Sequence, residues 1–259
     1  MVAEEQHSFW DHLEVLRGVI IRIVAVFLVV TIVAFCFKDT IFAIITAPQS
    51  SDFIFYRWLN ALLGALTEQS VDTFSVRIVN TQLAGQFILH MRMAMYVALL
   101  AVLPYILFEL FRFVSPGLYN NERQMARRVL LSGYIMFMFG VAMSYFIVFP
   151  LTFRFLGTYQ VMQEVDNLIT LESYISTLTS LNLMLGIVFE LPMLCWIMAK
   201  TGFITADTLK KYRRHAVVIL LIIAAVITPT ADVFTLIIVS LPMYLLYELG
   251  IAVAAHSKS

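Results

Sequence analysis

The stretch GVIIRIVAVFLVVTIVAFCF, residues 18–37, decides the fold class. A helix that crosses the roughly 30 Å hydrocarbon core of a bilayer needs about 20 predominantly apolar residues. This stretch meets that length, and its one charge, Arg22, lies a turn inside the start. From there the long Arg22 side chain can reach the headgroup region. The stretch therefore predicts a transmembrane helix.

The composition extends this interpretation to the whole chain. Hydrophobic residues make up 61% of the 259 residues and charged residues only 13%, against about 45–50% and 25% in ordinary globular domains. Seventeen Lys and Arg balance seventeen Asp and Glu. Low polarity with zero net charge excludes a disordered chain, an acidic tail and a nucleic-acid binder. We expect an all-α integral membrane protein that forms one domain over residues 1–259.

Five further apolar stretches complete six predicted spans, at residues 18–37, 93–113, 129–153, 174–199, 216–228 and 233–246. The last two are separated by PTAD at 229–232, a turn-forming cluster, and form a hairpin with short arms. About 13 residues in a helix reach only some 20 Å, less than the hydrocarbon thickness. Two interpretations remain open: neighbouring helices shield the ends, or the bilayer is thinned beside this hairpin.

Basic residues predict the orientation. Residues 112–128 carry four arginines and residues 200–215 carry five lysines and arginines, whereas the other connections are poor in positive charge. By the positive-inside rule both termini are cytoplasmic. Residues 38–86 then form an extracytoplasmic cap, with an amphipathic helix predicted at residues 55–66.

Polar residues inside predicted spans are the candidate functional residues, because they are costly there. Glu190 lies near the middle of the fourth span, and Pro192 beside it predicts a kink. Glu190 is either functional or a protonated acid hydrogen-bonded to a neighbouring helix. Asp232, at the hairpin tip, is expected to cap the last helix. Glu14 and Glu122 are acidic residues in basic surroundings, and local pairs with Arg17 and with Arg123 or Arg127 are the simpler interpretation.

The sequence contains no pattern typical of an enzyme, such as a zinc-protease, nucleophile-elbow or phosphate-loop motif. The five histidines lack ligand spacing, so no metal or other cofactor is expected. Cys36 and Cys195 are predicted to be buried small hydrophobes. The amino-terminal residues are acidic and amphipathic, unlike a cleaved signal peptide.

Seven strings, in order along the chain, give a family resemblance. They are HLEVLR (12–17), TAP (46–48), FRFVSPGLYNNER (111–123), GVAMSYFIVFP (140–150), FELP (189–192), ITPTAD (227–232) and SLPMYLLYELGI (240–251). Together they resemble the TatC family, the multi-spanning subunit of the twin-arginine protein translocase.

The resemblance implies a receptor, without catalytic chemistry, for the twin-arginine signal peptides of folded cargo. The implied binding residues are Glu122, Glu14, Arg17 and Phe113, and a guanidinium pairs well with carboxylates. Glu190, Asp232 and Tyr145 are implied to form an intramembrane polar surface for partners. Pro48, Pro116 and Pro192 are assigned structural roles.

Further implications are TatA/TatB-type single-span partners, other TatC copies and membrane lipid as contacts, a location in the bacterial inner membrane, and transport driven by the proton-motive force. Two positions depart from the family pattern. Val15 replaces the second glutamate of the amino-terminal motif, and Leu236 replaces the glutamine after the hairpin aspartate. A proton-coupled transporter that uses Glu190 is the alternative, although no internal repeat supports it.

Overall fold

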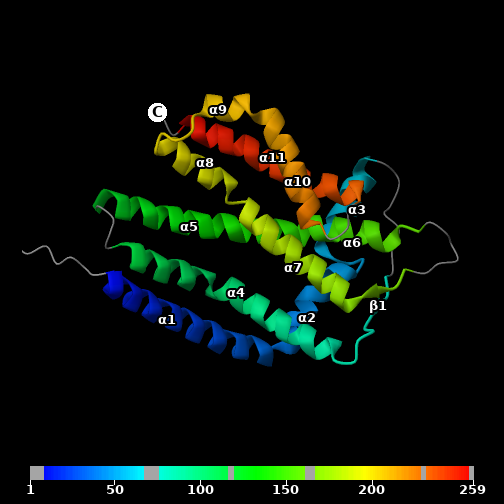
Figure 1. Ribbon diagram of the computed structural model, residues 1–259. Helices are drawn as coiled ribbons and strands as arrows, with labels where there is room; N and C mark the ends of the chain where they lie inside the picture. Colours follow the sequence, from blue (N-terminus) through cyan, green and yellow to red (C-terminus); the bar gives the residue numbers. More distant parts are fainter. Residues whose placement is uncertain (1–8, 67–75, 116–119, 161–166, 229–231, 257–259) are drawn as a thin grey trace, which may run out of the picture. The chain divides into compact units, whose positions relative to one another are not determined.

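The computed structural model describes residues 9–66, 76–115, 120–160, 167–228 and 232–256 (Figure 1). The all-α prediction is confirmed, because nearly every described residue is helical. The helices are α1 Phe9–Cys36, α2 Lys38–Thr46, α3 Ile54–Leu66, α4 Gly85–Val114, α5 Asn120–Met143, α6 Phe149–Thr158, α7 Leu171–Val188, α8 Leu191–Lys200, α9 Ala206–Lys211, α10 Arg213–Ile227 and α11 Val233–His256, with a 3-10 turn at Ala47–Gln49, a π-helical turn at Ser144–Val148 and two strands, β1 Ile78–Val79 and β2 Ile169–Thr170.

Five helical segments among the described residues are long and apolar enough to cross a membrane: Leu13–Cys36, Gly85–Val114, Arg123–Thr158, Leu171–Lys200 and Val233–His256. They correspond to five of the six predicted spans. The remaining predicted span is α10, which has only 15 residues, about 22 Å of helix.

The hairpin formed by α10 and α11 has one short arm instead of the two that were predicted. The last helix, α11, continues ten residues beyond Leu246 and contains 24 residues. The predicted span ended at residue 246 because the charged Glu248 follows soon after. In the structure the Glu248 carboxylate lies 2.7 Å from the Arg213 guanidinium at the start of α10. Tyr247 donates a hydrogen bond to the Leu209 carbonyl. Because both polar side chains have partners within the protein, the helix continues past these two residues.

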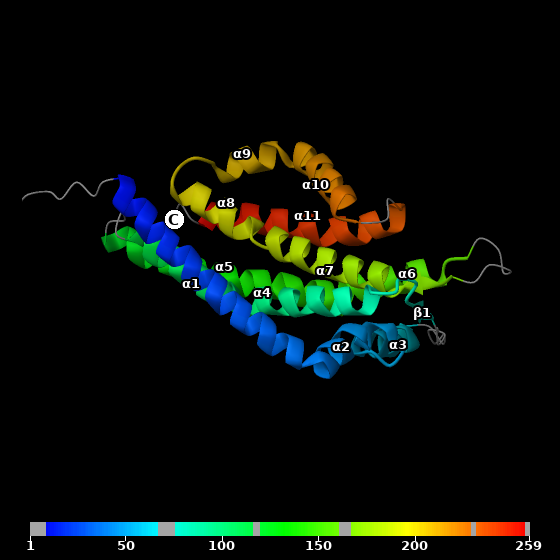
Figure 2. The same cartoon turned by 60° about the horizontal axis from the view of Figure 1, so that its bottom comes forward.

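The chain divides into two compact units, residues 1–41 with 87–134 and residues 42–86 with 135–259. The first unit contains α1, most of α4 and the first half of α5. In it α1 and α4 lie side by side (Figure 2). Near one end of this pair the His90 ring stacks on Phe35 with centroids 3.9 Å apart.

Toward the other end of the pair, an ion pair joins α1 to α4. Arg22 Nη2 and Nε donate to Glu109 Oε2 at 2.8 and 3.2 Å, and the Tyr105 hydroxyl donates to Glu109 Oε1. The Glu109 side chain is only 4% exposed. Arg22, which was expected to reach toward the headgroup region, also has a carboxylate partner on the neighbouring helix.

The second unit depends on close contact between α5 and α7. A Cβ on Gly140 would lie 2.7 Å from the Leu185 carbonyl oxygen and 2.9 Å from the Gly186 Cα. A Cβ on Gly186 would lie 2.7 Å from the Phe137 ring. Small residues let transmembrane helices approach this closely, and van der Waals packing then stabilises the contact.

Tyrosine hydroxyls hold the end of α2 in the second unit. The last carbonyls of a helix lack partners within it. Tyr174 donates to the Ile45 carbonyl at 2.8 Å, and Tyr145 donates to the Ile44 carbonyl. Tyr56, on α3, donates to the Pro150 carbonyl at 2.8 Å and to that of Pro48 at 3.4 Å. Burial raises the pKa of Tyr56, so its phenol keeps the proton that it donates.

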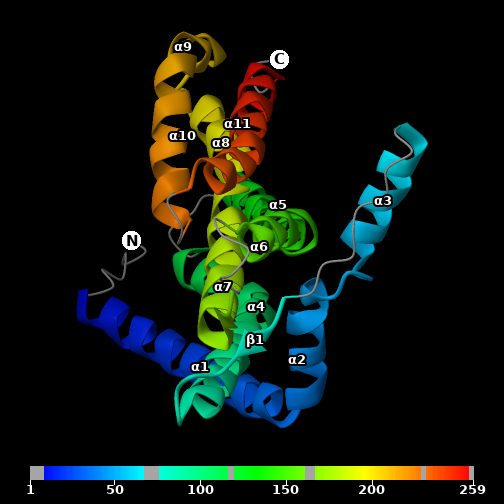
Figure 3. The same ribbon diagram turned by 90° about the vertical axis from the view of Figure 1, so that its right-hand side faces the viewer.

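The remaining parts of the second unit pack around α7. The strands β1 and β2 pair in parallel, with Ile78 opposite Ile169. The amphipathic helix predicted at residues 55–66 is confirmed as α3. The helices α8, α10 and α11 run beside one another (Figure 3), and Gly250 of α11 contacts Cys195 of α8.

We expect the Glu109→Gln variant to lower the Tm of the purified protein in detergent by a few degrees, because Arg22 would lose its charged partner in an apolar setting. Thermal unfolding of wild type, E109Q, R22Q and the R22Q/E109Q double variant measures the coupling between the two side chains. The double variant should regain part of the loss, since it removes both charges. A Tm that falls additively in the double variant would show that the two groups do not interact.

Candidate functional site

The predicted signal-peptide residues all lie in the first unit. Glu14 and Arg17 are exposed on α1, and Phe113 is half-buried in the last turn of α4. Glu122 is the third residue of α5, and its side chain lies outside the described residues, as does Pro116. No described hydrogen bond or ion pair joins these residues to one another.

The Arg22–Glu109 ion pair fixes which ends of α1 and α4 meet. Glu14 precedes Arg22 by eight residues, about 12 Å along α1, and Phe113 follows Glu109 by four, about 6 Å along α4. The two helices run in opposite directions, so both residues lie beyond the ion pair toward the same end (Figure 2). The α5 helix begins there too, six residues after α4 ends.

The Glu14 carboxylate projects outward at this end. The expected pair with Arg17 is not formed, and Glu14 makes no ion pair with any other described residue. Its neighbour Val15, at the position where the family often has glutamate, is also exposed, at 53%. Neighbouring helical side chains point about 100° apart, so little packs on this turn of α1. A carboxylate at the Glu14 position is therefore accessible to a ligand.

Four exposed arginines lie near the end of α4 and the start of α5. Arg112 is on α4, and Arg123, Arg127 and Arg128 are on α5. The Arg123 guanidinium donates to the Ser115 carbonyl oxygen at 2.9 Å, which ties the start of α5 to the end of α4. Against this positive background a cationic ligand would be attracted only close to the carboxylates.

Glu190 lies where the fourth apolar segment breaks, between the end of α7 and the start of α8. The break occurs beside Pro192, as the sequence predicts, because proline cannot donate the helical hydrogen bond. The Glu190 carbonyl accepts from the Leu194 amide at 2.9 Å. Its carboxylate is half-buried, and no hydrogen bond or ion pair joins it to a described residue. The expected bond to a neighbouring helix is therefore absent from the described part of the chain.

Asp232 caps α11, as predicted. Its Oδ1 accepts from the Thr235 amide at 2.7 Å, which satisfies one of the unpaired amides at a helix start. The hydroxyls of Thr228, at the end of α10, and Thr235, in the first turn of α11, are buried and have no partner among the described residues. The hairpin tip thus presents polar groups at the end of the short helix α10.

Tyr145 and Pro48 each take part in internal hydrogen bonds, Pro48 through its carbonyl, which accepts from the Tyr56 hydroxyl. Tyr145 is in the π-helical turn, and its hydroxyl donates to the Ile44 carbonyl two residues before the Thr46–Pro48 string. Its ring meets Phe53 edge-on. In this structure Tyr145 ties the end of α2 to the π-helical turn that follows α5.

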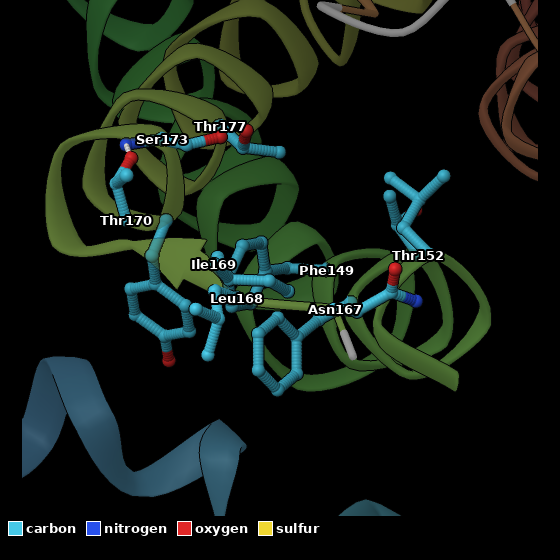
Figure 4. A pocket seen from close by; sticks show the side chains of 11 residues that line it. Phe149, Thr152, Asn167, Leu168, Ile169, Thr170, Ser173 and Thr177 are labelled. Carbon is cyan, nitrogen blue, oxygen red and sulfur yellow. Dashed lines mark hydrogen bonds between the residues drawn. The ribbon is translucent and has the colours of Figure 1, made fainter. Parts of the chain in front are cut away.

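A hollow of about 510 Å³ opens between α6, β2 and α7 (Figure 4). The hydroxyl of Thr152 on its wall is buried without a described partner, and the Thr170 hydroxyl accepts from the Ser173 amide. The amide group of Asn167 donates to the Tyr159 carbonyl. Tyr174 is the only titratable side chain on the wall, so the hollow offers hydrogen bonds rather than acid–base chemistry.

Sequence analysis missed two charged pairs, Arg22–Glu109 and Arg213–Glu248. In each pair the acidic residue lies among apolar residues near the end of a span, and this position is the feature of the sequence that could have predicted a charged partner. The prediction of a buried Cys36 is wrong: its side chain is exposed near the carboxyl end of α1, whereas Cys195 is half-buried. No group of three or more potential metal ligands is found among the described residues.

Comparison with known proteins agrees with this arrangement. A family model described as "Sec-independent protein translocase protein (TatC)" matches residues 11–242. The TatC protein of a Blattabacterium from Periplaneta americana is 33% identical over 259 residues, which cover 98% of this chain and 97% of that protein. The TatC protein of Desulforapulum autotrophicum is 31% identical, covering 96% and 84%.

A crystal structure described as the twin arginine translocase receptor TatC superposes with a TM-score of 0.71 at 28% identity, covering 96% of this chain and all of that one. A second TatC crystal structure, in the detergent DDM, superposes with a TM-score of 0.70. The family match and the full-length relatives agree with the helical architecture. The chain therefore belongs to the TatC family of Sec-independent protein translocase proteins.

Proposed function

We propose that this chain is the receptor subunit of a twin-arginine translocase, and that it binds the paired arginines of a signal peptide with Glu14 and Glu122. The observation that carries the proposal is the Glu14 carboxylate, which is exposed and makes no described ion pair at the end of α1 where α4 ends and α5 begins. Family membership supports the same role.

Guanidinium chemistry fits such a site. A carboxylate accepts two parallel N–H bonds from arginine, and this geometry is lost with lysine. Two acidic residues on different helices can each take one arginine of the pair. The nearby arginines of α4 and α5 repel cationic sequences that do not place their charges on those acids, so they add specificity.

The proposed orientation places this end of the first unit in the cytoplasm of a bacterium, with the chain in the inner membrane and both termini inside. The support is the excess of lysine and arginine in residues 112–128 and 200–215. Residues 38–86 would then cap the opposite face, where the cargo emerges.

Single-span subunits of the TatA and TatB type are the proposed partners, and α10 is the proposed contact. This helix has only 15 residues, and its apolar side chains Val218, Ile222 and Val226 are exposed along one face. Side-by-side packing of apolar helices is how single-span partners associate within a membrane. A short helix also favours a thinner bilayer around it. We propose that the cargo crosses the membrane at this thinned region, driven by the proton-motive force.

A proton-coupled transporter is the second candidate function. It is favoured by Glu190, a carboxylate without a described partner at the break between α7 and α8. Titratable groups at such breaks line ion pathways in transporters. The two candidates differ in whether the chain alone moves a solute.

For the receptor, we expect Glu14→Gln and Glu122→Gln each to reduce photo-cross-linking of a twin-arginine signal peptide about tenfold in membranes, the effect of losing one charge-assisted hydrogen bond. A twin-lysine peptide gives the background level. Asp207→Asn, which removes an exposed acid on α9, is the matched control and should retain wild-type cross-linking. Equal cross-linking of the arginine and lysine peptides to wild type would refute receptor function.

For the partner contact, we expect single cysteines at positions 218, 222 and 226, in a C36S/C195A background, to form disulfides with a cysteine in the span of a TatB-type subunit. Cysteines at positions 24, 28 and 32 are the control, because they are equally exposed and equally spaced on α1. The cross-linked species is measured on non-reducing gels. Equal yields from α1 and α10 would remove α10 as the partner surface.

For the transporter alternative, we expect proteoliposomes that contain only this chain to show no proton-coupled solute flux, and Glu190→Gln to leave that background unchanged. The measurement is the internal pH of the vesicles under an imposed gradient. Flux above that of empty vesicles, abolished by E190Q, would favour the transporter.

A further inference from the structure

An apolar groove of about 410 Å³ runs between α4 and α5 inside the first unit. On α4 its wall is formed by Pro104, Leu107, Phe108 and Phe111, and on α5 by Arg127, Leu130, Leu131 and Tyr134. Both sets follow the i, i+3, i+4, i+7 spacing of a single helical face. Seven residues rise about 10 Å, so the groove is a third as long as the hydrocarbon core is thick.

The mouth of the groove is cationic. Arg127 is the only charged residue on the wall, and it lies at the end nearest the start of α5. Arg123 lies one turn closer to that start and therefore on the same face of α5. Its guanidinium is held by the Ser115 carbonyl at 2.9 Å. One guanidinium, that of Arg127, thus lies on the wall of the groove, and that of Arg123 lies one turn closer to the start of α5.

We propose that this groove is a binding site for an anionic phospholipid, with an acyl chain along Leu107, Phe108 and Leu131 and the phosphate at Arg127. Phe108 and Leu131 are exposed, and both belong to segments long enough and apolar enough to cross a membrane, so their side chains are suited to contact with lipid. A guanidinium binds phosphate through paired charge-assisted bonds. If the groove bound lipids whatever their headgroup, the positive charge of Arg127 would lie beside hydrocarbon with no anion to pair with it.

Charge favours a lipid over a signal peptide in this groove. A twin-arginine peptide brings its own positive charges next to its apolar segment, and Arg127 and Arg123 would repel them. An anionic headgroup has the complementary sign. Lipid binding here is separate from signal-peptide binding, although Phe113 follows Phe111 by two residues on α4 and Glu122 precedes Arg127 by five on α5.

The test measures lipid binding by the full-length protein. Detergent-purified protein is titrated with phosphatidylglycerol and, separately, with phosphatidylcholine, and bound lipid is counted by native mass spectrometry. We expect phosphatidylglycerol to bind more tightly, and Arg127→Gln to weaken it about fivefold, the effect of one cationic side chain at a membrane surface. Arg128→Gln is the matched control, because it removes the same charge from the adjacent face of α5 and should bind as wild type does.

Two further arms distinguish the groove from surface charge alone. Leu131→Trp keeps both arginines and fills the groove, so it should also weaken binding of phosphatidylglycerol. Inorganic phosphate at the same concentration should not displace the lipid, because the acyl chain contributes to binding. Equal affinity of R127Q and R128Q for phosphatidylglycerol, or unchanged binding by L131W, would overturn the proposal.

A phosphatidylglycerol with a photoreactive acyl chain locates the site directly. We expect labelled peptides to contain residues 104–111 and 127–134, and not the exposed stretch of α1 around Leu28. Even labelling of α1, α4 and α5 would contradict a specific site. Displacement of the lipid by a twin-arginine peptide that itself labels residues 104–111 would assign the groove to the peptide and overturn the proposal.

Discussion

The hydrocarbon interior of a bilayer cannot donate or accept a hydrogen bond, and this constraint explains most of the contacts in the structure. Each backbone group that leaves a helical ladder must find a partner within the protein. The carbonyls at the end of α2 receive the hydroxyls of Tyr145 and Tyr174. The Thr235 amide at the start of α11 donates to the Asp232 carboxylate.

The same constraint determines how charged side chains are placed. Arg22 and Glu109 meet between α1 and α4, and Arg213 and Glu248 meet between α10 and α11. In the first pair the acid is buried and its arginine is half-exposed. Breaking such a pair leaves a charge alone, so it favours one particular arrangement of the two helices. The first pair thereby sets the register of the two helices, and the register brings Glu14 and Phe113 to one end.

The sequence predicts the membrane helices well because a run of about 20 apolar residues can be recognised without knowing what it packs against. Five predicted spans and the helix at residues 54–66 correspond to observed elements, and the break before Pro192 follows from proline's missing donor. Prediction failed where a charge depends on a residue distant in the sequence. Arg22 and Glu109 are 87 positions apart, so no local pattern joins them, and the length of α11 was underestimated because the partner of Glu248 could not be known. Among the candidate site residues, Glu14 is exposed and lacks the local pair with Arg17 that the sequence favoured, whereas the internal bond of Tyr145 depends on the packing of α2.

The contact between Gly140 and Gly186 has a consequence for sequence variation. Gly140 is the first letter of GVAMSYFIVFP, one of the strings by which family membership is recognised. A methyl group there would press on backbone atoms of α7, which cannot rotate away as a side chain could. The letter is therefore dictated by the space between two helices and not by any ligand. A recognisable motif in this family can thus mark a position where close helix packing leaves no space for a side chain larger than that of glycine.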